Sequence, residues 1–244
     1  MYISGIGAAL DKECRDKSIF KDLRRADNLS KMAVIAAQGA FFDSGLDNSA
    51  KENLGLILGT AFGPHVTTFR FLDDILNYGD AGVSPTLFSH SVHNAANAYI
   101  ASNLGIRGPA LTLTYFNASF YQALLVAESW LKEDRCEHIL LGSAEEYGKE
   151  MAYVLSGVAP EFGLKDGSAF FLVSKKKITN GYSSISAIAD QDAINGYILK
   201  GEDASGFACL EAAKMLREGA VKENKIYCIG KNINGERLAI RLEK

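Results

Sequence analysis

Hydrophobic and polar positions alternate along the chain between two patterns, one typical of buried strands and the other of helices. Runs that are apolar at nearly every position, such as Asn53–Thr60, predict parallel strands covered on both faces. Longer stretches with apolar residues at helical spacing, such as Ala26–Ser44, predict helices. The predicted strands are Tyr2–Gly7, Asn53–Thr60, Ala110–Thr114, His138–Gly142, Ser168–Lys175, Ser183–Ala189, Ile226–Ile229 and Arg237–Leu242. The predicted helices are Ala26–Ser44, Val66–Tyr78, Asn94–Leu104, Ser119–Lys132 and Ala208–Glu218.

The order of these elements predicts an α/β fold. Three strand–helix–strand passages in succession favour a mainly parallel sheet with right-handed crossovers, and the strand at Ala110–Thr114 is expected to be buried within it. Asn234-Gly235 between the last two strands is typical of a tight hairpin, because both residues tolerate positive φ. The chain has only 4 prolines and no low-complexity linker, so we expect residues 1–244 to form a single domain.

Composition narrows the class of protein. With 244 residues, 48% of them hydrophobic and 23% charged, the chain is an ordinary globular protein that can bury a core without disulfides. The net charge of −3 argues against nucleic acid as the main partner. No apolar run approaches the roughly 18 residues that span a bilayer, and the first ten residues lack the basic start of a signal peptide. We therefore expect a cytoplasmic protein without a membrane segment.

The residues that could hold metals or cofactors are few and scattered. The four cysteines form no CxxC pair, which favours structural thiols over zinc or disulfides. His90 and His93 lie three apart, but no carboxylate or cysteine cluster accompanies them, so hydrogen-bonded histidines in a buried loop are the preferred interpretation. Gly5-Ile6-Gly7 lacks the third glycine of a dinucleotide-binding turn and predicts only a tight turn. We expect no metal and no cofactor.

The segment Gly108–Ser119 has the most informative pattern for function. An apolar strand there runs into a tight turn and then directly into an apolar helix, which places Asn117 at a helix N-terminus. Free N–H groups and the helix dipole at such an elbow stabilise negative charge, and they lower the pKa of a nucleophile. An asparagine amide cannot attack an acyl group, but it can form a hydrogen bond with one. Simple capping of the helix by Asn117 is an equally good interpretation.

Other segments match a known family in order and spacing. They are Arg24–Leu46, a long helix followed by Gly-Leu; Gly55–Thr60, similar to IGVxxGT; Asn94–Pro109, similar to N…A…I…G…GP; Leu140–Glu145, similar to AGGxE; and Asp166–Val173, similar to GEGAGxLVL. In this pattern, up to about residue 175, the chain resembles the N-terminal half of a β-ketoacyl synthase. The resemblance implies a thiolase-like layered fold with a complete N-terminal half (1–180) and a shortened C-terminal half (181–244).

Two departures from the family bear on catalysis. The family's nucleophilic cysteine falls at Asn117, and no histidine follows His138, whereas the family's two catalytic histidines come from its C-terminal half. Glu236 stands near where one of those histidines would be. Because condensation through a thioester needs an activated thiolate, the resemblance implies that this chain alone does not condense acyl groups.

The resemblance also implies a partner. Type II polyketide and related systems, including those that make aryl polyenes, pair a synthase with a cysteine-less homologue called a chain-length factor. By this likeness the chain would form a heterodimer with an active ketosynthase in fatty acid or type II polyketide biosynthesis, and would act together with an acyl carrier protein. The candidates for a tunnel-facing or interface patch are Tyr115, Phe116, Asn117, Phe120 and Tyr121. Packing of these aromatic residues in the helix core is the alternative.

Two other functions stay open on the sequence. The chain could form a homodimer that binds an acyl chain or an acyl carrier protein without any synthase. It could also decarboxylate a malonyl thioester, with Asn117 and the helix dipole stabilising the enolate and no covalent step. Basic residues between Lys12 and Arg25 could dock an acidic carrier protein, but the acidic residues among them favour a solvated surface of mixed charge.

Overall fold

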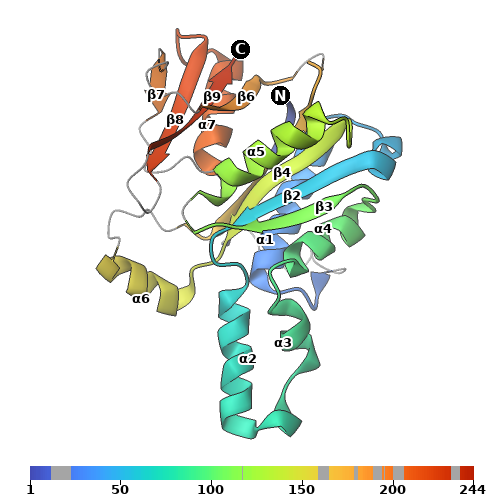
Figure 1. Cartoon of the computed structure of the whole chain (residues 1–244), viewed down its shortest axis with the longest axis vertical. Coiled ribbons are helices and arrows are strands. Elements are labelled where there is room, and N and C mark those ends of the chain that lie inside the picture. The colour runs from blue at the N-terminus through green and yellow to red at the C-terminus, as the bar shows by residue number, and fades with distance from the viewer. Residues whose placement is uncertain are drawn as a thin grey trace.

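The computed structural model describes residues 1–11, 23–116, 118–158, 165–178, 181–188, 194, 196–199, 206–231 and 237–244. Their strands form one sheet in the order β3-β2-β4-β5-β1-β6-β9-β8-β7 (Figure 1). The strands are β1 (Tyr2–Leu10), β2 (Leu54–Thr60), β3 (Ala110–Thr114), β4 (His138–Glu145), β5 (Gly167–Ser174), β6 (Ser184–Ile188), β7 (Tyr197–Leu199), β8 (Lys225–Lys231) and β9 (Arg237–Glu243). The α-helices are α1 (Asn28–Asp43), α2 (His65–Tyr78), α3 (Pro85–His90), α4 (Ala95–Leu104), α5 (Ser119–Lys132), α6 (Gly148–Val158) and α7 (Gly206–Glu218).

The strand directions confirm the predicted α/β class. β2 runs parallel to both β3 and β4, and β5 lies antiparallel between β4 and β1. The first four strands along the chain, β1 to β4, therefore all point in the same direction, as three successive strand–helix–strand passages require. The second part of the sheet, β6-β9-β8-β7, is antiparallel except at β7 and β8. β8 and β9 pair as the hairpin prediction expected, although its turn, 232–236, lies outside the described residues.

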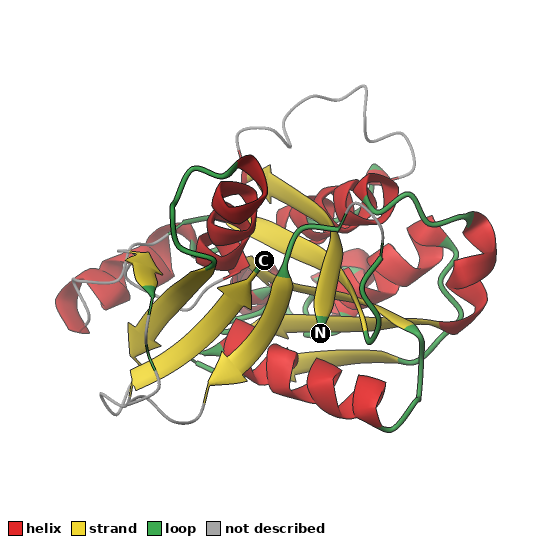
Figure 2. Ribbon diagram, turned by 90° about the horizontal axis from the view of Figure 1, so that it is seen from above, coloured by secondary structure: helices red, strands yellow, loops and turns green. Residues whose placement is uncertain are grey.

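Helices cover both faces of the first part of the sheet, which consists of β3, β2, β4, β5 and β1. α1 and α4 pack on one face, and α5 and α7 pack on the other. α5 and α7 also contact the second part of the sheet, whose strands are turned away from those of the first (Figure 2). None of the described helices is long and apolar enough to cross a lipid bilayer.

Side chains of the central strands enter two separate cores. In β2, Leu56 and Leu58 join the α1 side, whereas Ile57 joins the α5 side. In β5, Phe170 and Phe171 divide in the same way. Because successive side chains of a strand point to opposite faces, a strand that is buried on both sides must be apolar at every position. This confirms the interpretation of the continuous apolar runs.

The glycine pair in β1 corrects one prediction. Gly5 and Gly7 lie inside the strand rather than in a tight turn, and β1 continues to Leu10. A Cβ on either glycine would lie 2.1 Å from a carbonyl oxygen of α1, that of Ala40 or Ala36. The two glycines therefore let α1 pack directly on the strand backbone. A pattern read along the chain cannot distinguish this close approach from a turn.

Other differences concern short or marginal elements. β3 has the predicted bounds, but it is the edge strand of the sheet and is partly exposed rather than buried. α3, α6 and β7 were not predicted. α6 has apolar residues at helical spacing but buries only Leu155, so most of its apolar side chains lie on the surface.

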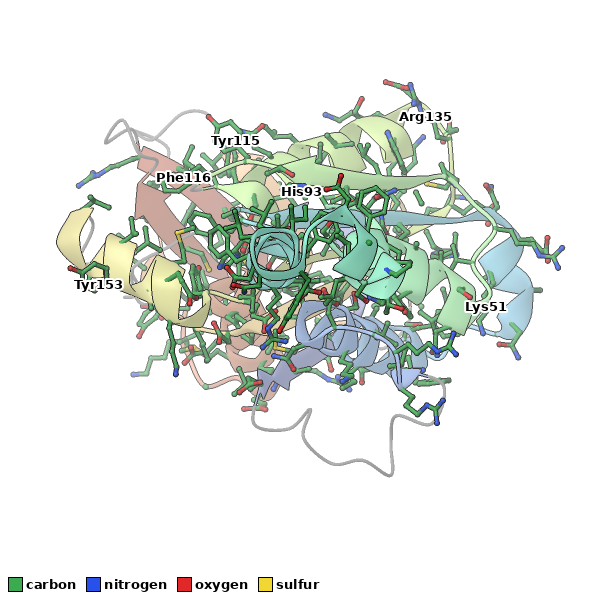
Figure 3. All side chains as sticks on the ribbon, turned by 90° about the horizontal axis from the view of Figure 1, so that it is seen from below. Lys51, His93, Tyr115, Phe116, Arg135 and Tyr153 are labelled. Carbon is green, nitrogen blue, oxygen red and sulfur yellow. The ribbon has the colours of Figure 1, made fainter. Side chains whose placement is uncertain are left out.

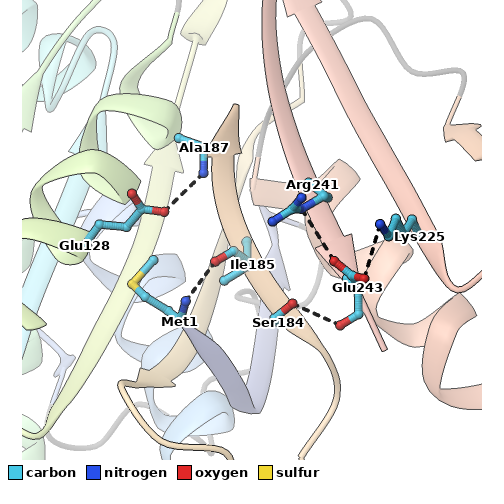
Figure 4. A network of polar contacts seen from close by, with 8 residues as sticks. All are labelled: Met1, Glu128, Ser184, Ile185, Ala187, Lys225, Arg241 and Glu243. Carbon is cyan, nitrogen blue, oxygen red and sulfur yellow. Dashed lines mark hydrogen bonds and ion pairs between the residues drawn. The ribbon is translucent and has the colours of Figure 1, made fainter. Parts of the chain in front are cut away.

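Polar contacts join the first and second parts of the sheet (Figure 4). The amino group of Met1 donates to the carbonyl oxygen of Ile185, and Glu128 of α5 accepts from the N–H of Ala187. On the second part itself, Glu243 pairs with Lys225 and Arg241. These ion pairs are partly exposed and add little stability, but they give this face of the second part a charged character.

Candidate functional site

The elbow between β3 and α5 is built at the carboxyl edge of the parallel strands. The N–H of Tyr115 donates to the carbonyl oxygen of Thr60 at 3.1 Å, which holds the end of β3 beside the end of β2. α5 starts at Ser119 behind an N-cap at Ala118, and no side chain caps the helix there. Asn117 and Glu236, both singled out from the sequence, lie outside the described residues.

Gly59 allows α5 to begin directly against β2. A Cβ on this residue would lie 2.5 Å from the carbonyl oxygen of Ser119 and 2.8 Å from its carbonyl carbon. Both are backbone atoms of the first turn of α5. The glycine near the end of the GLILGT strand therefore fixes how closely the elbow can approach the sheet.

Glu145 connects three elements around the elbow. Its carboxylate accepts hydrogen bonds from the backbone N–H groups of Ala61 and Phe62, which follow β2. It also accepts from the hydroxyl of Thr60 at 3.2 Å and from that of Ser119, in α5, at 3.5 Å. One side chain at the end of β4 thus holds both the turn after β2 and the start of α5.

The two adjacent glutamates at this edge have raised pKa values. Burial raises the pKa of Glu145 to about 7, although the hydrogen bonds that it accepts oppose the rise. Burial and the neighbouring Asp27 carboxylate raise the pKa of Glu146 to about 7, against a hydrogen bond from Asn28. Both carboxyls therefore hold a proton over a pH range where free glutamates have lost it.

These shifts predict a pH-dependent stability. A raised folded-state pKa gives stability that is complete below the unfolded value near 4.5 and is lost as pH rises through about 7. We expect the free energy of unfolding to fall between pH 5 and pH 7.5, by on the order of 3 kcal/mol from Glu145. Urea unfolding across this range measures it, and Glu145→Gln should make the slope clearly shallower. A wild-type stability that is flat in pH would contradict the prediction.

An aromatic cluster lies beside the elbow. The ring of Phe62 packs edge to face against three other rings. The distance between ring centroids is 5.0 Å to Phe116, 5.8 Å to His65 and 5.8 Å to Tyr147. His65 in turn contacts Phe69 of α2 at 5.8 Å, and its Nε2–H donates to the carbonyl oxygen of Tyr147 at 2.8 Å. The rings form one continuous run from the elbow to α2.

The structure separates the aromatic residues that the sequence grouped together. Phe120 and Tyr121 are buried in the core on the α5 side, where Phe120 packs on Phe171. Tyr115 and Phe116 are instead 43% and 41% exposed (Figure 3). An interface or tunnel role therefore suits Tyr115 and Phe116 better than the two core residues.

The two neighbouring histidines differ from one another. His90 is buried and stacks on Tyr99, whose hydroxyl lies 2.7 Å from its Nε2, as the hydrogen-bonded interpretation expected. His93 is exposed and lies against Gly63, so the prediction that both are buried was wrong for this one. In the part of the chain that the structure describes, no three His, Cys, Asp or Glu side chains gather closely enough to bind a metal.

Sequence reasoning missed Glu145 as the hub of the elbow. The motif similar to AGGxE located it, but only as part of a strand end. Its donors come from positions 60–62 and 119, which lie 26 to 85 residues away along the chain. An acidic residue at the end of a mostly buried strand was the one signal that could have indicated a buried role.

Comparisons of the sequence with known proteins find relatives among the β-ketoacyl synthases. Residues 4–162 match the family model "Beta-ketoacyl synthase, N-terminal domain". A curated relative, the chloroplastic 3-oxoacyl-[acyl-carrier-protein] synthase I of Arabidopsis thaliana, is 21% identical over 130 residues, which are 51% of this chain and 28% of the relative. The matched part of the chain thus spans well under half the length of that enzyme.

Solved structures share the fold at low sequence identity. The ishigamide ketosynthase/chain length factor matches with a TM-score of 0.73 and 17% identity, covering 99% of this chain and 98% of that one. A β-ketoacyl synthase from Burkholderia phymatum matches with a TM-score of 0.76, 11% identity and coverage of 100% and 98%. A ketosynthase in complex with its chain length factor from Xenorhabdus doucetiae matches with a TM-score of 0.65, 12% identity and coverage of 99% and 98%.

These matches place the chain in a family. The family model covers more than half of its residues, and the solved neighbours share its mixed sheet with helices on both faces. The resemblance found in the sequence and the predicted thiolase-like α/β fold are both confirmed. The chain belongs to the β-ketoacyl synthase family, of which it carries the N-terminal domain.

Proposed function

We propose that this protein is a non-catalytic, chain-length-factor-like subunit that pairs with an active ketosynthase. The observation that carries the proposal is that Asn117, and no cysteine, stands between β3 and α5, where the resemblance to the family puts the nucleophilic cysteine. Thioester condensation needs a thiolate, and an asparagine amide cannot supply one. The partner would provide the nucleophile and this chain would shape the shared site.

The similar structures support this kind of partner. Two of them are described as a ketosynthase with a chain length factor, and a third as a type II polyketide acyl-carrier protein in complex with its ketosynthase. Their identities of 12 to 17% establish the fold alone. Pairing, the acyl carrier protein as a further partner, and a role in fatty acid, type II polyketide or aryl polyene synthesis are therefore part of the proposal.

The edge of the sheet supports a pairing surface near the elbow. β3 is an edge strand, hydrogen-bonded to β2 on one side, and an unpaired strand edge is a ready site for a second chain. Tyr115 and Phe116 follow it directly and are exposed. We propose that the partner pairs here, with the Phe62–Phe116 contact closing the space beside the elbow and so limiting the acyl chain.

The whole chain acts as one unit in this proposal. Residues 1–180 and 181–244 form the two halves of a single domain, which the continuous sheet from β3 to β7 supports. The function requires no metal and no cofactor from this chain. Glu236 is proposed to lie near the position of a family histidine, without a catalytic role of its own.

Co-expression with a cysteine-bearing ketosynthase of the source organism tests the proposal. We expect a 1:1 complex that survives size exclusion at micromolar concentration, together with condensation of malonyl-carrier protein by the pair. This chain alone should neither condense nor decarboxylate. Separate elution of the two proteins would contradict the proposal.

The same preparations test the two alternatives. Native mass spectrometry of the chain alone would favour the self-associating binding protein if it found a stable homodimer and the synthase did not bind. Release of carbon dioxide from malonyl-carrier protein, abolished by Asn117→Ala, would favour the decarboxylase.

A further inference from the structure

The carboxyl group of Glu145 is surrounded by hydrogen-bond donors from two elements. The backbone N–H of Ala61 donates to its Oε1, and that of Phe62 donates to its Oε2 at 3.4 Å. The hydroxyl of Thr60 donates to Oε2 at 3.2 Å, and that of Ser119 donates to Oε1 at 3.5 Å. Each oxygen thus receives one backbone N–H and one hydroxyl, which is the arrangement that suits an ionised carboxylate.

The neutral acid fits these donors less well. A neutral carboxyl carries a hydrogen on one of its oxygens, and the backbone N–H that faces this oxygen cannot accept it. The hydroxyl of Thr60 is engaged on its other side, because it accepts from the N–H of Gly63 at 2.9 Å. Protonation of Glu145 therefore weakens contacts to residues 60–63, which we call the elbow turn.

The elbow turn positions the exposed rings of the elbow. Phe62 lies within the turn, and its ring packs edge to face on that of Phe116, with the centroids 5.0 Å apart. Phe116 and the neighbouring Tyr115 are exposed at the proposed pairing surface (Figure 3). A turn that is held by the carboxylate fixes these rings before a partner arrives, and preorganisation of this kind raises affinity.

Glu146, the next residue, is a separate group with contacts of its own. It accepts from the side-chain amide of Asn28 at 3.4 Å, which ties it to α1 rather than to the elbow turn. Burial raises the pKa of both glutamates to about 7. The charged side chains that act on Glu146 are Asp27, Asp166 and Arg70. Because the two glutamates have similar pKa values and different partners, Glu146 is a matched comparison for Glu145.

Two histidines border the elbow turn. His65 packs on its aromatic ring, and His93 lies against its glycine. The other elements at this edge, α5, α7 and β5, meet β4 through Ser119, Gly206 and Gly167, which carry no charge. Among the described residues around the turn, the histidines and the neighbouring glutamate are therefore the groups to separate from Glu145 in any titration.

We infer that Glu145 is the positioning residue of the elbow and that its ionisation switches the pairing surface on. The inference rests on the proposed pairing and adds to it a control that lies within this chain. With the carboxylate ionised, the elbow turn is held and the rings of Phe62 and Phe116 are fixed for the partner. When the carboxyl takes up a proton from solvent, the turn loosens and pairing weakens. Because the ketosynthase binds the ionised form better, pairing releases this proton.

The expected pH dependence of pairing is opposite to that of stability. The free chain holds the proton on Glu145 below pH about 7, and its stability falls as pH rises through this value. Affinity for the ketosynthase should instead rise over the same range, by up to about tenfold from pH 6 to pH 8. A merely structural role of Glu145 would make affinity follow stability downward or leave it unchanged.

The dissociation constant of the complex with a cysteine-bearing ketosynthase, measured from pH 6 to pH 8, tests the switch. Glu145→Gln has one acceptor oxygen and one donor group, so it mimics the neutral acid. It should bind up to about tenfold more weakly than wild type at pH 8 and equally to wild type at pH 6. Glu146→Gln, His65→Gln and His93→Gln should each keep the pH dependence of wild type. All variants meet the same synthase, so titration of the synthase contributes equally to each.

Amide hydrogen exchange in the free chain gives a second readout that needs no partner. The N–H groups of Ala61 and Phe62 donate to Glu145. Their protection factors in the wild-type chain should therefore be larger at pH 8 than at pH 6, and they should be equal at the two pH values in Glu145→Gln. No difference in wild type, or the reverse order, would overturn the inference.

The outcomes separate this inference from the proposed function. If the wild-type chain pairs with an affinity that is constant or falls with pH, the proposed function stands and the inference fails. If Glu146→Gln or either histidine variant removes the pH dependence, that group is the switch and the inference also fails. If the wild-type chain pairs at no pH, the proposed function fails and the inference with it. Glu145→Gln should melt no lower than wild type at pH 8, because it removes a buried charge.

Discussion

Gly59→Ala is expected to destabilise the protein by about 3 kcal/mol, through overpacking between β2 and α5. The added Cβ would lie 2.5 Å from the carbonyl oxygen of Ser119, a backbone atom that cannot rotate away. β2 is buried at every position, so the strand cannot shift outward to make room. The first turn of α5 must move instead. For a chain of this size, the loss corresponds to a fall of about 6–12 °C in melting temperature, measurable by circular dichroism.

Gly157→Ala is the matched control for that substitution. Gly157 lies in α6, and a Cβ there would meet no atom within 4 Å. Alanine favours a helix by up to about 1 kcal/mol over glycine, so this variant should be as stable as wild type or slightly more stable. If the melting temperatures of Gly59→Ala and Gly157→Ala are the same, α5 does not pack on β2 as closely as the structure shows.

Phe116→Asp is expected to weaken pairing with the ketosynthase at least about 100-fold. Phe116 follows the edge strand β3 and is 41% exposed in the free chain, at the centre of the proposed interface. A carboxylate buried there without a partner costs several kcal/mol, and about 2.7 kcal/mol already lowers affinity 100-fold. The dissociation constant, measured by titrating labelled synthase with each variant, gives the result directly.

Phe42→Asp controls for the general effect of adding charge at an exposed ring. Phe42 is 69% exposed and lies near the end of α1, on the opposite face of the sheet from α5. It should leave the affinity within about twofold of wild type. An equal loss for both variants would show that charge, and not position, weakens the pair, and would remove β3 and Phe116 from the interface. Melting temperatures of both variants establish that they are folded.

Much of the fold could be predicted from the sequence because its elements have strong local patterns. β3 and α5 have the predicted bounds, and β2 starts within one residue of its prediction. Apolar runs and helical periodicity report burial directly, so long buried elements are visible without coordinates. α3 and β7 are too short to show such a pattern, and α6, whose apolar residues do follow helical spacing, buries only Leu155.

Part of the candidate site could also be predicted from the sequence, and part of it could not. The elbow followed from a strand, a turn and a helix that are contiguous in the chain, so the sequence was sufficient to predict the bounds of β3 and α5, whereas the role of Asn117 stays a prediction. The four donors to Glu145 and the ring contacts of Phe62 join segments far apart in the chain. Only the packing of β2, β4 and α5 brings them together.

Residue order alone was enough to establish the class of fold, the family and the absence of a cysteine between β3 and α5. Each depends on residue identity and on spacing along one chain. Only the packing in three dimensions shows that β3 is an edge strand, that Phe120 and Tyr121 belong to the core while Phe116 is exposed, and that α2 and α3 project from the sheet. Exposure and sheet order depend on what packs beside a residue in space, and an apolar pattern is the same whether its cover comes from this chain or from a partner.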